Sequence, residues 1–207
     1  LAWRVAEEDF LKEMPWLDNL KLRTGWGQVG NDGIGDYSFG SSLQVRATPY
    51  GGGFLLNNIP NPSVKWESTT QWNFGLDLGL FKNRVEFIAE YYNKYTKDLL
   101  MRQLVPDYLG TLKGIGQDWQ GISQPYTNTS EMENKGFEFT LNTINIKNRD
   151  FEWNTSITFS KNKNKITSLG LDNAAIYRKV QWYDFVTKTA VGQPVGQFYG
   201  YVVEGIF

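Results

Sequence analysis

The sequence QWNFGLDLGLFKNRVEFIAEYYN, from Gln71 to Asn93, decides the fold. The apolar residues of its first part share one side of an alternating pattern: Trp72, Phe74, Leu76, Leu78 and Leu80. Polar and small residues occupy the other side: Gln71, Asn73, Gly75, Asp77 and Gly79. A period of two is that of a β-strand, because successive side chains of a strand point to opposite faces.

A second alternating segment follows, and it pairs with the first as a hairpin. A two-residue turn at Lys82 and Asn83 suits this reading, because asparagine tolerates the positive φ that such turns require. The turn places Leu78 opposite Phe87, and it keeps apolar residues opposite each other along one face. This one register places the apolar residues of both strands on one face and most polar residues on the other, which favours it over a register shifted by one residue.

The apolar face of the hairpin has two interpretations. Nine residues from Trp72 to Leu80 span about 30 Å, and at a tilt of about 40° they cover the ~25 Å apolar band of an outer-membrane barrel. The same face could instead pack against another sheet in a β-sandwich.

The composition excludes several classes of function. The 207 residues carry a net charge of −1, so the chain has no overall positive potential that would attract nucleic acid. The chain has no cysteine and no histidine, so thiolate chemistry and the commonest general base are unavailable to it. No apolar run approaches the length of a transmembrane helix, whereas alternating strands of a membrane barrel would read as polar on average.

The lengths of the connections favour the membrane barrel. Short turns are expected at residues 82–83 and 147–150, and long loops at residues 31–65 and 99–133, with little regular structure beyond a short strand at Leu43–Ala47. Outer-membrane barrels have short periplasmic turns and long extracellular loops, whereas a sandwich has no reason to segregate its loops. We therefore expect an all-β fold, with about six antiparallel strands in a transmembrane β-barrel.

One nucleotide-binding pattern is rejected. Gly25, Gly27 and Gly30 spell G-x-G-x-x-G after a strand, but a dinucleotide site needs a helix to follow. The turn-rich residues 31–36 cannot begin that helix.

Several blocks in order resemble the SusC/RagA type of TonB-dependent outer-membrane transporter. They include LKLRTGWGQVGN at residues 20–31, ENKGFE at 133–138 and VGQPVG at 191–196, the last followed by FYGY at 198–201. The resemblance covers nearly the whole chain.

The resemblance implies part of a transporter in the bacterial outer membrane. Residues 1–207 would belong to one large transmembrane β-barrel domain, as an internal piece of its C-terminal half with about six of its strands, and with the plug domain and the N-terminal and C-terminal barrel strands absent. The implied partners are TonB, reached through the plug, a SusD-type surface lipoprotein as lid, outer-membrane lipid, and an oligosaccharide or peptide cargo. Two alternatives stay open: a carbohydrate-binding β-sandwich module and a passive outer-membrane porin.

Transport requires no chemistry on the cargo, so we expect no enzyme activity and no catalytic, cofactor or metal site. Asp77, Glu86 and Glu90 are better explained as groups in a watery lumen than as glycosidase carboxylates. The residues expected to face the lumen are Asn73, Asp77, Glu86, Glu90, Glu138 and Asn142. Those expected to face lipid are Trp72, Phe74, Leu76, Leu78, Leu80, Phe87 and Tyr91. Contacts with cargo or lid are assigned to aromatic residues of the second long loop: Tyr108, Trp119 and Tyr126.

Overall fold

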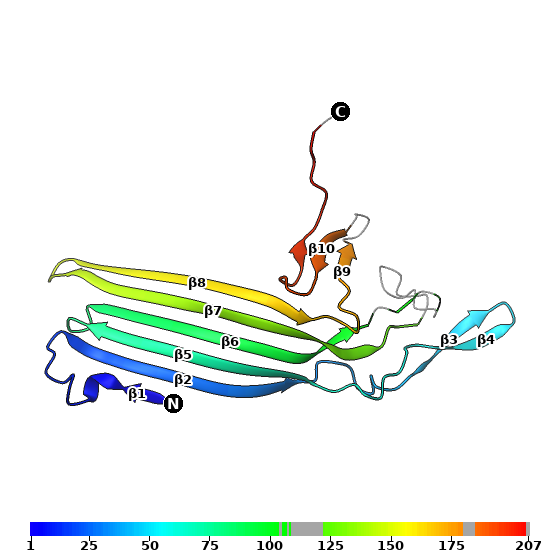
Figure 1. Ribbon diagram of the computed structural model, residues 1–207, viewed down its shortest axis with the longest axis horizontal. Coiled ribbons are helices and arrows are strands. Elements are labelled where there is room, and N and C mark those ends of the chain that lie inside the picture. Colours follow the sequence, from blue (N-terminus) through cyan, green and yellow to red (C-terminus); the bar gives the residue numbers. More distant parts are fainter. Residues whose placement is uncertain (104, 107, 109–121, 180–184, 206–207) are drawn as a thin grey trace. The chain divides into compact units, whose positions relative to one another are not determined.

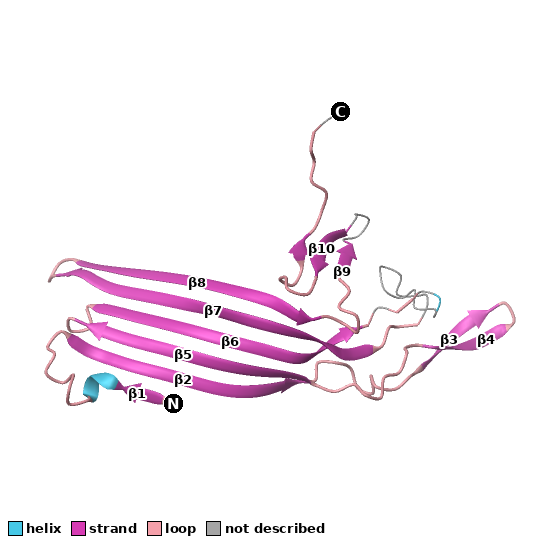
Figure 2. Cartoon of the chain, in the orientation of Figure 1, coloured by secondary structure: helices cyan, strands magenta, loops and turns pink. Residues whose placement is uncertain are grey.

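The chain is built around a six-stranded antiparallel sheet (Figures 1 and 2). The computed structural model describes residues 1–103, 105–106, 108, 122–179 and 185–205. The strands of the sheet, in spatial order, are β1 (Ala2–Arg4), β2 (Leu17–Asn31), β5 (Glu67–Leu80), β6 (Val85–Arg102), β7 (Tyr126–Lys147) and β8 (Glu152–Ser168). The predicted all-β class and the expected number of about six antiparallel strands are thus confirmed.

Smaller elements complete the described chain. They are a 3₁₀ turn η1 (Val5–Glu7), a hairpin of β3 (Leu43–Thr48) and β4 (Gly51–Leu56), and a small sheet of β9 (Ile176–Lys179), β10 (Phe185–Thr189) and β11 (Gln197–Phe198). In the described part of the chain, no helix is long and apolar enough to cross a membrane.

The chain divides into two compact units, which we describe separately. The first unit holds Leu1–Val29, Thr69–Tyr95 and Glu133–Asn164, and the second holds Gly30–Ser68, Thr96–Met132 and Lys165–Phe207. The first unit contains both short turns, and the second contains the long connections. Buried apolar side chains are few among the described residues: Val5, Ile166 and Leu169.

Both short turns lie where the sequence predicts them. The Arg84 amide donates to the Phe81 carbonyl at 3.3 Å, which closes a turn around Lys82 and Asn83. Lys82 and Asn83 have φ of 59° and 55°, as such a turn requires, and Phe81 also has a positive φ of 57°. The second turn closes where the Asn148 amide donates to the Phe151 carbonyl at 2.8 Å.

The second long connection is shorter than the sequence suggests, whereas the first, at residues 32–66, has the expected length. β6 continues to Arg102 and β7 begins at Tyr126, so the second connection covers residues 103–125 rather than 99–133. The first connection contains the β3–β4 hairpin, in which the expected strand pairs with a second one that begins in the glycine triplet at Gly51. The prediction of little regular structure there was wrong, because glycine and proline indicate loops only when nothing pairs with the segment. The rejected glycine motif lies inside β2, and no helix follows it.

One glycine lets three strands of the first unit approach closely. A Cβ atom added at Gly136 of β7 would lie 2.7 Å from the Lys161 carbonyl oxygen of β8 and 2.8 Å from the Tyr92 hydroxyl of β6. Gly136 is buried beneath the Tyr92 ring although it lies in a sheet. The aromatic ring therefore covers a backbone position where no side chain fits.

We expect Gly136→Ala to destabilise the six-stranded sheet by about 1–3 kcal/mol, because the added methyl group overpacks against a backbone carbonyl that cannot rotate away. Gly27→Ala is the matched control, since a Cβ there meets nothing within 4 Å, and its effect should stay within about 0.5 kcal/mol. Urea unfolding of the complete protein measures both changes. Equal stabilities of the two variants would contradict the close packing at Gly136.

Candidate functional site

The sheet of the first unit has one face that carries aromatic ladders. Trp26 of β2 packs on Trp72 of β5 with ring centroids 6.2 Å apart, and Phe74 stacks on Tyr91 of β6 at 6.5 Å. The Phe74–Tyr91 contact agrees with the hairpin register predicted from the sequence. The rings remain open to the surroundings, as the 59% exposure of Trp26 shows. We call this side the aromatic face.

A second ladder extends the aromatic face across β6, β7 and β8. Phe87 stacks on Phe139 at 5.9 Å, and Phe139 stacks on Phe159 at 6.4 Å. Phe137 lies 5.1 Å from Phe139. The two ladders place exposed or half-buried rings on five neighbouring strands, β2, β5, β6, β7 and β8, and no second sheet of this unit covers them.

The opposite side, which we call the polar face, is organised by Arg23 of β2. Its Nη2 atom donates to Asp77 Oδ1 at 2.8 Å and to Glu90 Oε1 at 2.7 Å, and its Nε atom donates to Asp77 at 3.2 Å. Lys21 Nζ lies 3.7 Å from the other Asp77 oxygen. The positive charges of two side chains and the negative charges of two carboxylates, from three neighbouring strands, therefore balance.

A glycine makes this ion-pair cluster possible. A Cβ atom added at Gly75 would lie 2.9 Å from Arg23 Cζ, so the guanidinium group occupies the space that a side chain would fill. Arg23 thereby lies flat across β5 and reaches from Asp77 to Glu90 on β6. Arg23 and Lys21 were not among the residues selected from the sequence, although their alternation on β2 places them on the same face as Gly25.

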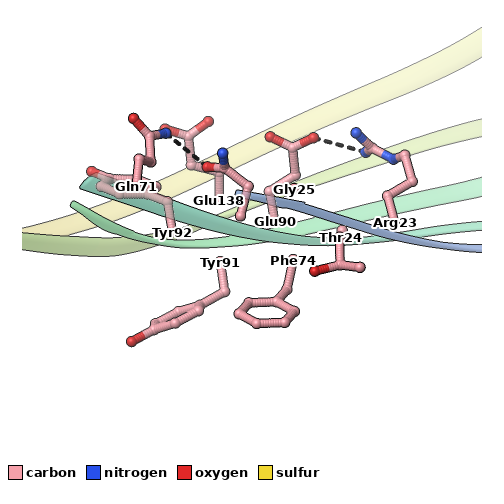
Figure 3. A pocket seen from close by; sticks show the side chains of 11 residues that line it. Arg23, Thr24, Gly25, Gln71, Phe74, Glu90, Tyr91, Tyr92 and Glu138 are labelled. Atoms are coloured by element: carbon pink, nitrogen blue, oxygen red, sulfur yellow. Dashed lines mark hydrogen bonds and ion pairs between the residues drawn. The ribbon is translucent and has the colours of Figure 1, made fainter. Parts of the chain in front are cut away.

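An open pocket of about 460 Å³ lies beside the cluster. Figure 3 shows Gln71, Glu90, Glu138 and Arg23 on one side of the sheet, while Phe74 and Tyr91 point to the other side. Asn73 also lines this pocket. Polar groups from four strands thus converge around one depression.

The other predicted lumen residues lie on the same face, nearer the short turns. Glu86 and Asn142 line a separate pocket of about 280 Å³. The Ser156 hydroxyl of β8 donates to Asn142 Oδ1 at 2.8 Å there. The structure therefore groups the six predicted residues on one polar face, in two clusters. Contact of the polar face with a lumen stays a prediction. Contact of the aromatic face with lipid stays a prediction as well.

The second unit contains a pocket formed by the long connections. Its volume is about 510 Å³, and residues 35–42, Asn57, Asn58, Arg102 and Tyr126 line it. The Arg102 guanidinium lies over the Tyr126 ring, with Cζ 5.3 Å from the ring centroid. We call this pocket the loop pocket.

Asparagine side chains hold the backbone of the loop pocket. Asn58 Oδ1 accepts from the Ser42 amide at 3.1 Å, and Asn61 Nδ2 donates to the Tyr126 carbonyl at 2.7 Å. Nearby, Asn128 Oδ1 accepts from the Lys65 amide at 2.9 Å, while its Nδ2 donates to the Lys65 and Asp98 carbonyls at 2.7 and 2.8 Å. Side chains here replace the backbone partners that a regular sheet would provide.

The three aromatic residues assigned to cargo or lid contact have different positions. Tyr126 lines the loop pocket, but it is the first residue of β7 rather than part of a loop. Tyr108 is 85% exposed. Trp119 lies outside the described residues. Among the described residues, no cluster of three or more acidic side chains is arranged to hold a metal ion.

The fold and the whole length of the sequence match one family. The family model described as "TonB dependent receptor-like, beta-barrel" matches residues 2–201. The chain therefore belongs to the TonB-dependent receptor β-barrel family, whose members are bacterial outer-membrane transporters and not enzymes.

Individual relatives confirm the predicted SusC/RagA type. The chain is 35% identical over 186 residues to the TonB-dependent receptor SusC of Bacteroides thetaiotaomicron, covering 86% of this chain and 18% of that protein. It is 34% identical to TonB-dependent receptor P3 of Formosa agariphila, covering 100% of this chain and 20% of that protein. The solved RagAB peptide transporter superposes with a TM-score of 0.78 at 26% identity, over 95% of this chain and 20% of that one. The chain thus spans about a fifth of the length of these relatives.

We expect Asp77→Asn to destabilise the barrel more than Glu90→Gln. Asp77 faces both Lys21 and Arg23 with a side chain only 21% exposed, whereas Glu90 is 46% exposed and accepts one hydrogen bond from Arg23. Charge-assisted hydrogen bonds contribute about 1.5–3 kcal/mol when shielded, and exposed pairs contribute below about 1 kcal/mol. Urea unfolding of the two variants in vesicles measures the difference. A larger loss for Glu90→Gln would contradict this ranking.

Proposed function

We propose that the chain forms part of the barrel wall of an active importer for oligosaccharides or peptides. The family match over residues 2–201 is the observation that carries the proposal. The two faces of the first unit suit a barrel wall, because one face offers exposed rings to lipid and the other offers charges and amides to a watery interior.

The spacing of aromatic side chains supports contact with a membrane. Trp72 of β5 and Phe81, in the turn directly after β5, lie at the two ends of the apolar stretch, and their side chains are 48% and 55% exposed. The nine steps between them cover about 30 Å, which becomes about 23 Å along the membrane normal at a tilt of about 40°. This separation is close to the ~25 Å between the aromatic girdles of outer-membrane barrels.

The assignment of the two faces predicts opposite effects of arginine on one strand. Leu76→Arg, midway along the apolar stretch, should destabilise the inserted barrel by about 2–4 kcal/mol, because it places a charge in hydrocarbon. Asn73→Arg on the polar face should cost below about 1 kcal/mol. Urea unfolding from vesicles measures both changes, and a more costly Asn73→Arg would reverse the assignment of the faces.

TonB and a SusD-type lid are the proposed partners of the complete protein. TonB would supply the energy through the plug domain, and the lipoprotein would close the end of the barrel that carries the long connections. The family description supports the first partner, and the similarity to the RagAB peptide transporter supports a two-component assembly. A passive porin would need neither partner, and the TonB-dependent family speaks against that alternative as well as against a β-sandwich module.

The loop pocket is the proposed place of cargo contact in this chain. Amide, hydroxyl and guanidinium groups from residues 35–42, Asn57, Asn58 and Arg102 line it, together with the Tyr126 ring. Such a set can bind sugar hydroxyl groups or peptide amides by hydrogen bonds, while the ring packs against the apolar part of either cargo. Its position in the long connections suits a site that cargo meets before entering the barrel.

Uptake by the complete transporter tests the proposal. Cells that express it should accumulate labelled oligosaccharides or peptides, and deletion of tonB or collapse of the proton gradient should abolish the accumulation. Uptake that continues unchanged without TonB would show a passive pore instead. A panel of glycans and peptides in the same assay identifies the cargo class.

Tyr126→Ala should lower uptake at limiting cargo by roughly tenfold, because a lost aromatic contact and a disturbed pocket wall cost about 1–3 kcal/mol of binding free energy. Tyr50→Ala removes the same side chain from the tip of the β3–β4 hairpin, where Tyr50 is fully exposed, and should leave uptake unchanged. Surface labelling of both variants confirms equal amounts in the membrane. Equal uptake by the two variants would exclude the loop pocket as a cargo site.

A further inference from the structure

The aromatic face of the first unit ends in lysines on β7 and β8. Phe159 belongs to the aromatic ladder, and alternation along β8 places Lys161 and Lys163 on the same face. Phe137 places Lys135 of β7 there by the same argument. We call these three residues the lysine cluster.

The three lysines are neighbours across the two strands, which lie side by side in Figure 1. The close approach of Gly136 to the Lys161 carbonyl aligns the two segments. Strands pair about 4.8 Å apart, and alternate residues on one strand lie about 6.6 Å apart, so three ammonium groups can reach one headgroup. Lys135 also forms an ion pair with Glu133 at 3.2 Å, which leaves the cluster with a net charge of +2.

The cluster lies at the level where an apolar band ends. Trp153 marks the turn end of β8 on the same face and is 53% exposed. Lys163 follows ten residues later, about 33 Å along the strand and about 25 Å along the membrane normal at a tilt of about 40°. Lysines at this depth extend their ammonium groups into the headgroup layer while their methylene chains remain beside acyl chains.

We propose that the lysine cluster binds the phosphorylated headgroup of a glycolipid in the outer leaflet of the membrane. The proposal rests on the proposed function, since it requires the aromatic face to contact lipid. Lysine ammonium groups bind phosphate as point charges, and each basic residue close to an anionic lipid surface strengthens binding. The rings of Phe137 and Phe159 lie directly below the lysines and pack against the acyl chains of the same lipid.

The geometry favours a lipid over a soluble anion. A free phosphate ion would use only the ammonium groups, whereas the lysines continue an apolar surface without interruption. The side of the barrel also matters. The cluster lies toward the end of β7 and β8 that is opposite the short turn between them, since Lys135 is nine residues after the start of β7 and Lys163 is five residues before the end of β8. That end faces the outside of the cell in outer-membrane barrels.

Lipid retention by the complete transporter tests the proposal. The purified wild type and the Lys161→Gln/Lys163→Gln variant are exchanged into vesicles that contain a diphosphorylated acyl-glucosamine lipid, and the retained lipid is measured by native mass spectrometry. We expect roughly tenfold or greater loss of retention in the variant, from about fivefold for each lysine. The same lipid without its phosphates should be retained weakly and equally by both proteins.

Lys94→Gln/Lys147→Gln is the matched control. It removes the same charge from the other face of β6 and from the end of β7 next to a short turn, and it should retain lipid as the wild type does. Equal retention by the wild type and the Lys161/Lys163 variant would overturn the proposal. Equal retention of the phosphorylated and the dephosphorylated lipid by the wild type would overturn it as well.

Failure of this proposal is distinguishable from failure of the proposed function. If Leu76→Arg destabilises the inserted barrel while lipid retention is unchanged by the lysine substitutions, the aromatic face contacts lipid but the lysines bind no headgroup. If Leu76→Arg has no effect, the assignment of the faces fails, and the lipid proposal fails with it.

Discussion

Backbone hydrogen bonding between neighbouring strands is the constraint on which the structure depends. Hydrocarbon offers no partner for an amide or a carbonyl, so a membrane-spanning sheet must pair every strand, and side chains alone can meet lipid or water. The period of two in residues 71–93 follows from that condition. A rigid ladder fixes which residues share a face, and the aromatic rings of the first unit could not stack from Trp26 to Tyr91 otherwise.

Glycines allow the polar face to carry large side chains on this rigid ladder. Arg23 lies across Gly75, and the Tyr92 ring covers Gly136. Each pairing places a long or broad side chain over a backbone position without a Cβ atom, so that strands keep their spacing while charged groups reach across them. The ion pairs of Arg23 with Asp77 and Glu90 therefore depend on the glycine at position 75 as much as on the positions of the charged residues.

Sequence reasoning succeeded where one periodicity governs a segment. It predicted the β5–β6 hairpin, the turn at Lys82 and Asn83, and the polar face. It missed β4, because a glycine triplet reads as a loop until a partner strand is known. It also missed Arg23, since nothing local relates β2 to β5 across the long first connection. The end of β6 was placed too early and the start of β7 too late, because hydrophobicity no longer alternates in those parts of the two strands.

The same distinction separates the wall of the barrel from the proposed cargo site. In the wall, the strands are joined by backbone hydrogen bonds, and the side chains need only alternate between apolar and polar. In the loop pocket, asparagine side chains such as Asn58 and Asn61 complete the hydrogen bonding of the backbone. Such contacts follow no period, so each depends on one residue at one position. Substitutions there can reshape the pocket without disturbing the strands, and this allows one barrel architecture to serve importers with different cargoes.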